Sequence, residues 1–229
     1  SSEHSNIWDD GYPSGGNYWS DYTIRYPDAY ELDDSGIWDT PYIIDENNRD
    51  HYPLMNPVVP DVAVVSVVPS ATEVYVGWKV DITVVVKNEG KIAETFTVKC
   101  KYELEGVEQG IGTQTVTNLA PKANTTLTFT WTTTDVTVHT IKAEATILPG
   151  ETDTADNTMT SPVTVKVKLL GDVNGDNKVD IRDIAQAGLA FGSYPNHPRW
   201  NTQADVYQDG KVDIRDMALI AKNFGETYP

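Results

Sequence analysis

The chain has 229 residues, of which 39% are hydrophobic and 22% charged, proportions that are normal for a globular protein of two or three domains. Its 34 acidic and 17 basic residues give a formal net charge of −17, which repels phosphate groups, so we expect no nucleic-acid partner. The single cysteine excludes an intramolecular disulfide, and no apolar run is long enough for membrane insertion.

Residues 1–57 form the most acidic region and hold 10 of the 22 aromatic residues. Neither helical nor strand periodicity persists among the many Gly, Pro, Asn and Ser residues, so we predict an irregular, aromatic-rich segment. Trp8, Trp19 and Trp38 could stack on sugar rings, although aromatic residues in such a segment more often form a small irregular core. A set of oxygen ligands could hold calcium or simply cap turns: Asp33, Asp34, Asp39, Asp45, Asn47 and Asp50.

Two stretches of this segment are distinctive, NIWDDGYPSGGNYWSDY (residues 6–22) and DDSGIWDTPYIIDENNRDHYPLM (residues 33–55). They resemble the tail that closes archaeal right-handed parallel β-helix proteins of the NosD-like group. The copper binding associated with that group does not carry over, because copper prefers clustered His, Met or Cys and this segment has no such cluster. The resemblance implies a segment that packs on the rest of the chain or on a neighbouring molecule.

Residues 58–168 are rich in Val and Thr and alternate apolar with polar residues, a pattern typical of β-strands. About seven short strands separated by turn sequences predict an Ig-like β-sandwich. Four sets of alternating residues are expected to face its core: Val80, Ile82, Val84 and Val86; Phe96, Val98, Cys100, Tyr102 and Leu104; Leu127, Phe129 and Trp131; Ile141, Ala143, Ala145 and Ile147. Cys100 is therefore expected to be a buried structural thiol. Asn124 opens an Asn-Thr-Thr sequon, a candidate glycosylation site.

Four stretches of the middle region carry a family resemblance, namely DVAVVSVVPS (61–70), VVVKNEGK (84–91), NLAPKANTT (118–126) and ETDTADN (151–157). Over residues 60–168 they are similar to CARDB, a cell-adhesion-related domain found in bacteria and archaea. The resemblance implies a spacer or binding module of secreted and surface proteins rather than a catalytic domain.

Residues 169–229 contain a duplication: DNKVDIRDIAQAGLAFG (176–192) and DGKVDIRDMALIAKNFG (209–225) are identical at 10 of 17 positions. Each copy fits a twelve-position calcium loop, in which alternating residues turn oxygen atoms toward one point. The first loop offers Asp172, Asn174, Asp176, the Lys178 carbonyl, Asp180 and Asp183. The second offers Asp205, Tyr207, Asp209, the Lys211 carbonyl, Asp213 and Asp216. We predict two Ca²⁺ sites, the second weaker because Tyr207 replaces a side-chain oxygen ligand.

Each loop is followed by an apolar run with helical spacing. One such half cannot cover its own apolar face, so we expect the two halves to pack together and bury Ile184, Phe191, Met217, Ile220 and Phe224. Val179 is expected to pair with its counterpart in the second loop, and Asn177 to adopt the left-handed conformation that the turn needs. Because about 60 residues make a marginal core, calcium should contribute to folding.

Two features distinguish this repeat from an EF-hand: position 12 is Asp rather than Glu, and no amphipathic helix precedes either loop. Over residues 169–226 the repeat resembles a type I dockerin. That resemblance implies two halves related by a pseudo-twofold axis and a cohesin partner that contacts loop positions 10 and 11. These positions hold Ile181–Arg182 and Ile214–Arg215, not the Ser–Thr pair of familiar cellulosomal dockerins. We therefore expect a partner with a partly apolar, acidic surface.

Together these features predict a mainly β chain with an irregular segment (1–57), an Ig-like β-sandwich (58–168) and a small α-helical dockerin (169–229). Because no catalytic motif is present, we predict a non-catalytic structural or adhesion protein, secreted or at the cell surface. Its dockerin would bind Ca²⁺ and attach to a cohesin-like domain or to other copies of the chain, the latter giving a head-to-tail filament. The alternative is an ancillary polysaccharide-binding part of a secreted carbohydrate-active enzyme, with the N-terminal tryptophans as glycan contacts.

Overall fold

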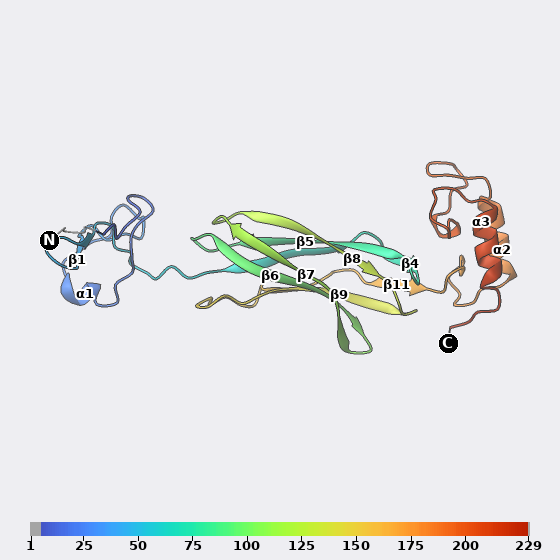
Figure 1. Ribbon diagram of the computed structural model, residues 1–229, viewed down its shortest axis with the longest axis horizontal. Coiled ribbons are helices and arrows are strands. Elements are labelled where there is room, and N and C mark those ends of the chain that lie inside the picture. The colour runs from blue at the N-terminus through green and yellow to red at the C-terminus, as the bar shows by residue number, and fades with distance from the viewer. Residues whose placement is uncertain (1–5, 229) are drawn as a thin grey trace. The chain divides into compact units, whose positions relative to one another are not determined.

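The computed structural model describes residues 6–228 and divides the chain into two compact units between Val59 and Pro60 (Figure 1). The first unit contains one short helix, α1 (Tyr22–Arg25), and one small antiparallel sheet, β1 (Tyr42–Ile43) with β2 (Arg49–Asp50). Turns make up most of the remainder, as expected for its Gly- and Pro-rich sequence. That residues 169–229 form a domain of their own stays a prediction.

Aromatic rings form the core of the first unit. Trp19 stacks on Tyr42 with ring centroids 4.2 Å apart, and Tyr22 stacks on Trp38 at 4.9 Å. The buried Asp50 carboxylate joins this core, because it accepts hydrogen bonds from the Trp19 indole (2.9 Å) and from backbone N–H groups. Stacked rings therefore replace regular secondary structure as the source of stability in this unit.

The second unit begins with a β-sandwich of two sheets (Figure 1). The smaller sheet has the order β3 (Val62–Pro69), β5 (Lys79–Asn88), β8 (Asn124–Thr132). The larger has the order β4 (Glu73–Tyr75), β11 (Val165–Lys168), β9 (Val138–Ala145), β6 (Glu94–Leu104), β7 (Val107–Leu119), with β10 (Thr158–Thr160) also paired to β9. All pairs are antiparallel except β4 with β11. The sandwich thus has nine strands, whereas the sequence predicted about seven.

Period-2 alternation correctly identified the core of the sandwich. The four β5 residues from Val80 to Val86 that were expected to face inward are fully buried, and so are Val98 and Cys100 of β6. Burial raises the pKa of the Cys100 thiol to about 12, which makes it unreactive near neutral pH. The prediction was wrong for Ile147, which is 58% exposed because β9 ends at Ala145 and the alternation ends with it.

The C-terminal part of this unit contains α2 (Ile181–Ala190), the short 3₁₀ turn η1 (Thr202–Ala204) and α3 (Ile214–Lys222). Figure 1 shows α2 and α3 lying side by side. Asp180 and Asp213 begin the two long helices through capping boxes, in which each side chain accepts a backbone N–H of the first helical turn. None of the helices in the described part of the chain has the length and apolar character that a membrane crossing requires.

The two phenylalanines expected in the core of this part are outside it: Phe191 is 45% exposed and Phe224 is 53% exposed. The helices end at Ala190 and Lys222, so the helical spacing that placed these rings inward stops before it reaches them. The core is instead built from small and β-branched residues of loops and helices: Val173, Val179, Ala187, Ala190, Ala204, Val206, Val212 and Ile220. Ile184 and Met217 lie at its margin.

The pairing expected between Val179 and Val212 also differs. Val179 exchanges backbone hydrogen bonds with Gly225 and Glu226, the segment that follows α3. Val212 exchanges them with Gly192 and Ser193, the segment that follows α2. Each loop is therefore joined to the end of the opposite helix, and the two halves depend on each other for backbone hydrogen bonds.

Gly171 occupies a position that only glycine fits. Its φ of +102° is strained for any other residue, and an added Cβ would lie 3.3 Å from the Ile220 backbone of α3. We expect Gly171→Ala to lower the free energy of unfolding by about 1–3 kcal/mol, measured by urea denaturation. The control is Gly188→Ala on the exposed face of α2, where an added Cβ meets no neighbour and should stabilise by about 0.5–1 kcal/mol. Equal effects at both positions would contradict this account of Gly171.

Candidate metal centre

Three carboxylates of the first loop converge. Ligand oxygens of Asp172, Asp176 and Asp183 all lie within 4.8 Å of one another, and no other group of this kind was found among residues 6–228. Asp172 and Asp183 are fully buried, whereas Asp176 is exposed. Three negative charges this close repel one another, and a hard divalent cation would remove that repulsion.

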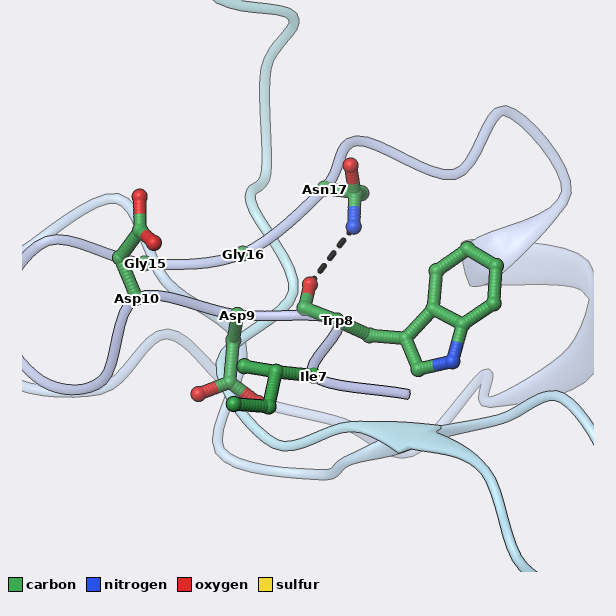
Figure 2. A pocket seen from close by; sticks show the side chains of 7 residues that line it. All are labelled: Ile7, Trp8, Asp9, Asp10, Gly15, Gly16 and Asn17. Carbon is green, nitrogen blue, oxygen red and sulfur yellow. Dashed lines mark hydrogen bonds between the residues drawn. The ribbon is translucent and has the colours of Figure 1, made fainter. Parts of the chain in front are cut away.

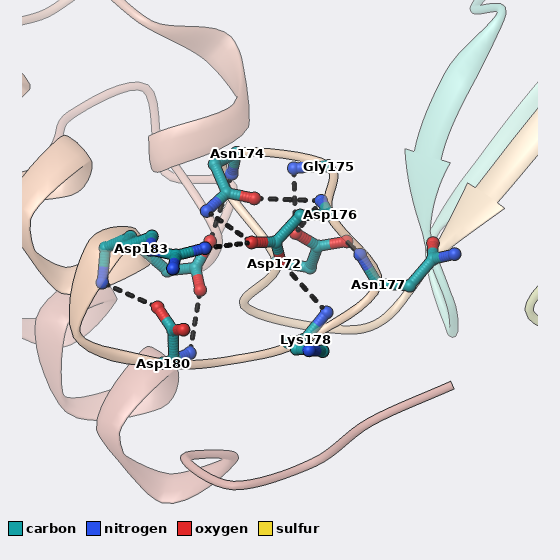
Figure 3. Close-up of polar contacts among 9 residues, drawn as sticks. Asp172, Asn174, Gly175, Asp176, Asn177, Lys178, Asp180 and Asp183 are labelled. Atoms are coloured by element: carbon teal, nitrogen blue, oxygen red, sulfur yellow. Dashed lines mark hydrogen bonds and ion pairs between the residues drawn. The ribbon is translucent and has the colours of Figure 1, made fainter. Parts of the chain in front are cut away.

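The loop is folded around the Asp172 carboxylate. It accepts backbone N–H groups from Gly175 (2.7 Å), Asp176 (3.0 Å) and Asn177 (3.0 Å) (Figure 3). Asn177 has the left-handed φ of +64° that the sequence predicted for this turn. Burial raises the pKa of the Asp172 carboxyl, because its charged form has lost most of its hydration. A bound cation would compensate for that loss.

The last positions of the loop link the cluster to helix α2. Asp183 accepts the backbone N–H of Asn174 (3.0 Å) at one oxygen and that of Asp180 (2.8 Å) at the other, which fixes the orientation of its carboxylate. The Asp180 side chain instead accepts the backbone N–H of Arg182 (2.7 Å) and caps the helix. Asp180 thus serves as the helix cap, whereas the side chains of Asp172 and Asp183 accept hydrogen bonds from the loop backbone.

The second loop repeats this framework. Asp205 accepts the N–H groups of Gly210 (3.0 Å) and Asp209 (3.2 Å), and Asp216 accepts those of Tyr207 (2.9 Å) and Asp213 (2.7 Å). Burial raises the pKa of Asp205, as it does for Asp172 in the first loop. The two copies therefore share their internal hydrogen bonds as well as their sequence.

Compared with Arg182, which pairs with Asp176 alone at the matching position of the first loop, Arg215 makes more contacts in its own loop. Its guanidinium pairs with the carboxylates of Asp209 and Asp213 and lies 5.3 Å from the centre of the Tyr207 ring. The hydrogen bond from Arg215 lowers the pKa of Asp213. The Tyr207 phenol is more than half exposed. A protein cation thus pairs with position 5 of each loop, Asp176 in the first and Asp209 in the second, and in the second loop it pairs with Asp213 as well. That the second site is the weaker one stays a prediction.

The residues expected to contact a partner occupy matching exposed positions. Ile181 and Ile214 are the first residues of α2 and α3 and are 65% and 69% exposed. The neighbouring Arg182 and Arg215 guanidinium groups are directed toward Asp176 (3.2 Å) and Asp213 (2.8 Å) in their own loops. The repeat therefore presents the same Ile–Arg pair twice, beside each loop.

In the first unit the expected calcium ligands do not gather. Asp33 accepts the Tyr12 hydroxyl (2.6 Å), Asp45 accepts the Asn48 amide (2.8 Å), and Asp50 lies in the aromatic core.

Trp19 and Trp38 are engaged in the ring stacks of that core. Trp8, beside them, lines a pocket of about 300 Å³ together with Ile7, Asp9, Asp10, Gly15, Gly16 and Asn17 (Figure 2). The Asn17 amide donates to the Trp8 carbonyl (2.6 Å) there.

In the sandwich, the sequon residue Asn124 is exposed at the start of β8.

One residue beside the loops escaped sequence reasoning. Tyr75 of β4 is fully buried, and its hydroxyl lies 3.1 Å from the Asp172 carbonyl and 2.8 Å from the Gln203 carbonyl. Nothing in the local pattern of β4 distinguishes this tyrosine from an ordinary sandwich residue. The contact spans 97 residues, and only the tertiary structure reveals it.

Comparison with known proteins confirms two of the three resemblances. Residues 59–161 match the CARDB family model, and residues 170–225 match the model of the dockerin type I domain. No curated protein is significantly similar to the chain. Dockerin type I domains typically bind Ca²⁺ and mediate protein–protein interactions with cohesins, and both kinds of domain are non-catalytic and typical of extracellular proteins.

Several solved structures are similar to part of the chain. The CARDB domain of a Pyrococcus furiosus protein, crystallised in complex with di-metal ions, is 28% identical over 50% of this chain and 98% of that chain, with a TM-score of 0.40. A solution structure of that domain is 27% identical over 48% and 96%, with a TM-score of 0.37. A β-glucosidase from Listeria innocua is 15% identical over 55% and 19%, with a TM-score of 0.35. The chain is thus similar to CARDB domains over residues 59–161 and to dockerin type I domains over residues 170–225.

Proposed function

We propose that this chain is a non-catalytic extracellular assembly protein, in which a calcium-loaded dockerin attaches a CARDB spacer to a protein partner. The observation that carries the proposal is the convergence of Asp172, Asp176 and Asp183 within a duplicated loop that matches the dockerin type I domain. Calcium would hold each loop closed and thereby hold the exposed Ile–Arg pairs in place at the helix starts. Extracellular calcium is near millimolar, which suits loops of modest affinity.

The proposed ligands follow the loop positions. In the first site they are Asp172, Asn174, Asp176, the Lys178 carbonyl, Asp180 through a water, and Asp183. In the second they are Asp205, Asp209, the Lys211 carbonyl, Asp213 through a water, and Asp216, with Tyr207 contributing no carboxylate. The residues fit a hard cation, since all the atoms offered are oxygens and the innermost carboxylates are already desolvated.

The proposed docking surface consists of Ile181, Arg182, Ile214 and Arg215. An exposed isoleucine at the first position of a helix contributes little to the stability of the fold, whereas apolar residues beside arginine are common in protein interfaces. The arginines would favour an acidic partner surface, and the isoleucines a shallow apolar one. The partner could be a cohesin-like domain or another copy of this chain.

Replacing all four docking residues by alanine is expected to weaken partner binding by about 100-fold or more in calcium, because the exposed contacts of both repeats are removed. Surface plasmon resonance against an immobilised cohesin domain measures this, and light scattering of the full chain measures self-association. The control combines Val107→Ala with Val138→Ala, two exposed residues of the sandwich. Full binding by the fourfold variant would contradict the proposed surface.

The same experiment separates the possible partners. Large particles that dissolve when EGTA is added would identify other copies of this chain as the partner, as proposed for a head-to-tail filament. A monomer that binds the cohesin domain would identify a separate protein as the partner. Chain that binds polysaccharide but no protein would favour the alternative carbohydrate-binding role, for which the pocket beside Trp8 is the candidate site.

We also propose that the first unit serves as a packing surface. Its resemblance to the closing tail of NosD-like β-helix proteins suggests this role, and the internal stacking of Trp19 and Trp38 supports it. Rings that already form a core have less free surface for sugars.

A further inference from the structure

Tyr75 belongs to the sandwich by sequence and to the dockerin by its contacts. It lies in β4, yet its side chain is packed in the C-terminal core with Val173, Val206 and Ile220. Its ring meets the edge of Trp78 at 5.0 Å. The side chain is fully buried. Both oxygen atoms within reach of its hydroxyl are backbone carbonyls, which only accept, so the hydroxyl acts as a hydrogen-bond donor.

This donor reaches the entrance of both calcium loops. The Asp172 carbonyl, 3.1 Å away, belongs to the first residue of the first loop. The Gln203 carbonyl, 2.8 Å away, lies in η1, two residues before the second loop begins at Asp205. One buried hydroxyl thus lies between the backbone segments from which the two loops start, and the two carbonyls share its single proton.

The sandwich holds this tyrosine firmly. Tyr75 is paired with Lys168 in the parallel β4–β11 ladder, and its carbonyl accepts the buried Thr133 hydroxyl at 3.0 Å. The Lys168 ammonium, itself buried, lies 5.2 Å from the centre of the Tyr75 ring. Strand β11 then leads directly into the first loop, where the Asp172 N–H donates to the Leu169 carbonyl. A rigid strand therefore supports the start of a loop that must close around an ion.

We propose that Tyr75 is a positioning residue for the calcium sites, through which the CARDB sandwich raises the calcium affinity of the dockerin. The inference rests on the calcium binding proposed above. A loop whose first residue is already fixed loses less conformational freedom when it closes around the ion, so it binds more tightly. Coupling of this kind is reciprocal, and calcium stabilises the contact between Tyr75 and the loops by the same factor.

Tyr75→Phe tests this proposal because it removes the hydroxyl and keeps the ring. For the full chain we expect about fivefold weaker calcium binding by titration calorimetry, as follows from the loss of one buried hydrogen bond. The gain in melting temperature on adding calcium should also shrink. The matched control is Tyr102→Phe, whose ring packs on Trp131 within the sandwich and whose affinity should equal that of the natural sequence.

The outcomes distinguish two kinds of failure. A natural-sequence chain that binds no calcium would overturn the proposed function itself. The inference is overturned if the natural chain binds calcium, Tyr75→Phe binds it equally well, and the substitution lowers the melting temperature by the same amount in calcium and in EGTA. The hydroxyl would then stabilise the fold without affecting calcium binding. Should Tyr75→Phe fail to fold, Thr133→Val tests the same support from the sandwich side. Weaker calcium binding is then expected, and unchanged binding would contradict the inference.

Discussion

Asp172→Ala is expected to weaken calcium binding by the first loop by more than about 100-fold. Even the loss of a residue that only hydrogen-bonds to a metal ligand lowers metal affinity by about 10–100-fold. Asp172 is the buried centre of the loop and accepts three of its backbone N–H groups. Asp205→Ala in the second loop should have a smaller effect, because Tyr207 replaces a side-chain oxygen ligand there and Arg215 pairs with two carboxylates of that loop, whereas Arg182 pairs with one in the first. Titration calorimetry on the full chain measures both.

Asp172→Asn separates the charge of this residue from its structural role. Its one amide oxygen can still accept the N–H groups of Gly175 and Asp176, which share one oxygen of Asp172, whereas the negative charge that calcium needs is lost. Calcium affinity should therefore fall as in Asp172→Ala, with less damage to the calcium-free fold. Asp153→Ala, which removes an exposed carboxylate of the sandwich, is the charge-matched control. Natural affinity in Asp172→Asn would show that the first loop is not a calcium site.

Chelation should produce the corresponding effect without a mutation. A ligand present at about 100 times its Kd stabilises a fold by about 2.7 kcal/mol, so EGTA should lower the melting temperature of the C-terminal part by about 10 °C or more. The sandwich should stay folded, because its core contains no calcium ligand among the residues proposed. Calorimetric melts that coincide with and without EGTA would contradict a folding role for calcium.

The second large effect is expected in the sandwich core. Ile82 is fully buried in β5, the central strand of its sheet, and is paired with Phe129 of β8. Ile82→Ala leaves a cavity in this core and should lower the free energy of unfolding by about 2–5 kcal/mol in urea denaturation. Ile147→Ala makes the same chemical change at an exposed position and should alter stability by less than about 0.5 kcal/mol. Similar losses in the two variants would contradict the assignment of these faces.

The proposed roles of the two domains are connected at Tyr75. If the sandwich positions the calcium loops, the CARDB domain is more than a spacer, because it sets the calcium concentration at which the dockerin becomes competent for docking. Closure of one calcium loop would then also affect the other half, because backbone hydrogen bonds join each loop to the end of the opposite helix. These bonds join Val179 to Gly225 and Glu226, and Val212 to Gly192 and Ser193. A partner would then meet the two Ile–Arg pairs in one fixed arrangement.

The sequence alone determined the features that depend on near neighbours. The inward faces of β5, β6 and β9 follow from period-2 alternation, and the grouping of Asp172, Asp176 and Asp183 follows from their spacing within one loop. The left-handed turn at Asn177 is equally local. Such features were predictable because the backbone geometry of a strand or a short loop fixes where alternate side chains lie.

Only the tertiary structure decided the features that depend on distant segments. Phe191 and Phe224 lie outside the core because the helices end before them. Val179 and Val212 pair with the ends of opposite helices rather than with each other, and Tyr75 reaches the loops across 97 and 128 residues. The physical reason is that side-chain periodicity says which face is apolar but not which distant surface will cover it. The sequence thus determined where the carboxylates of the proposed calcium site gather, and only the tertiary structure showed that Tyr75 of the sandwich contacts the start of that loop.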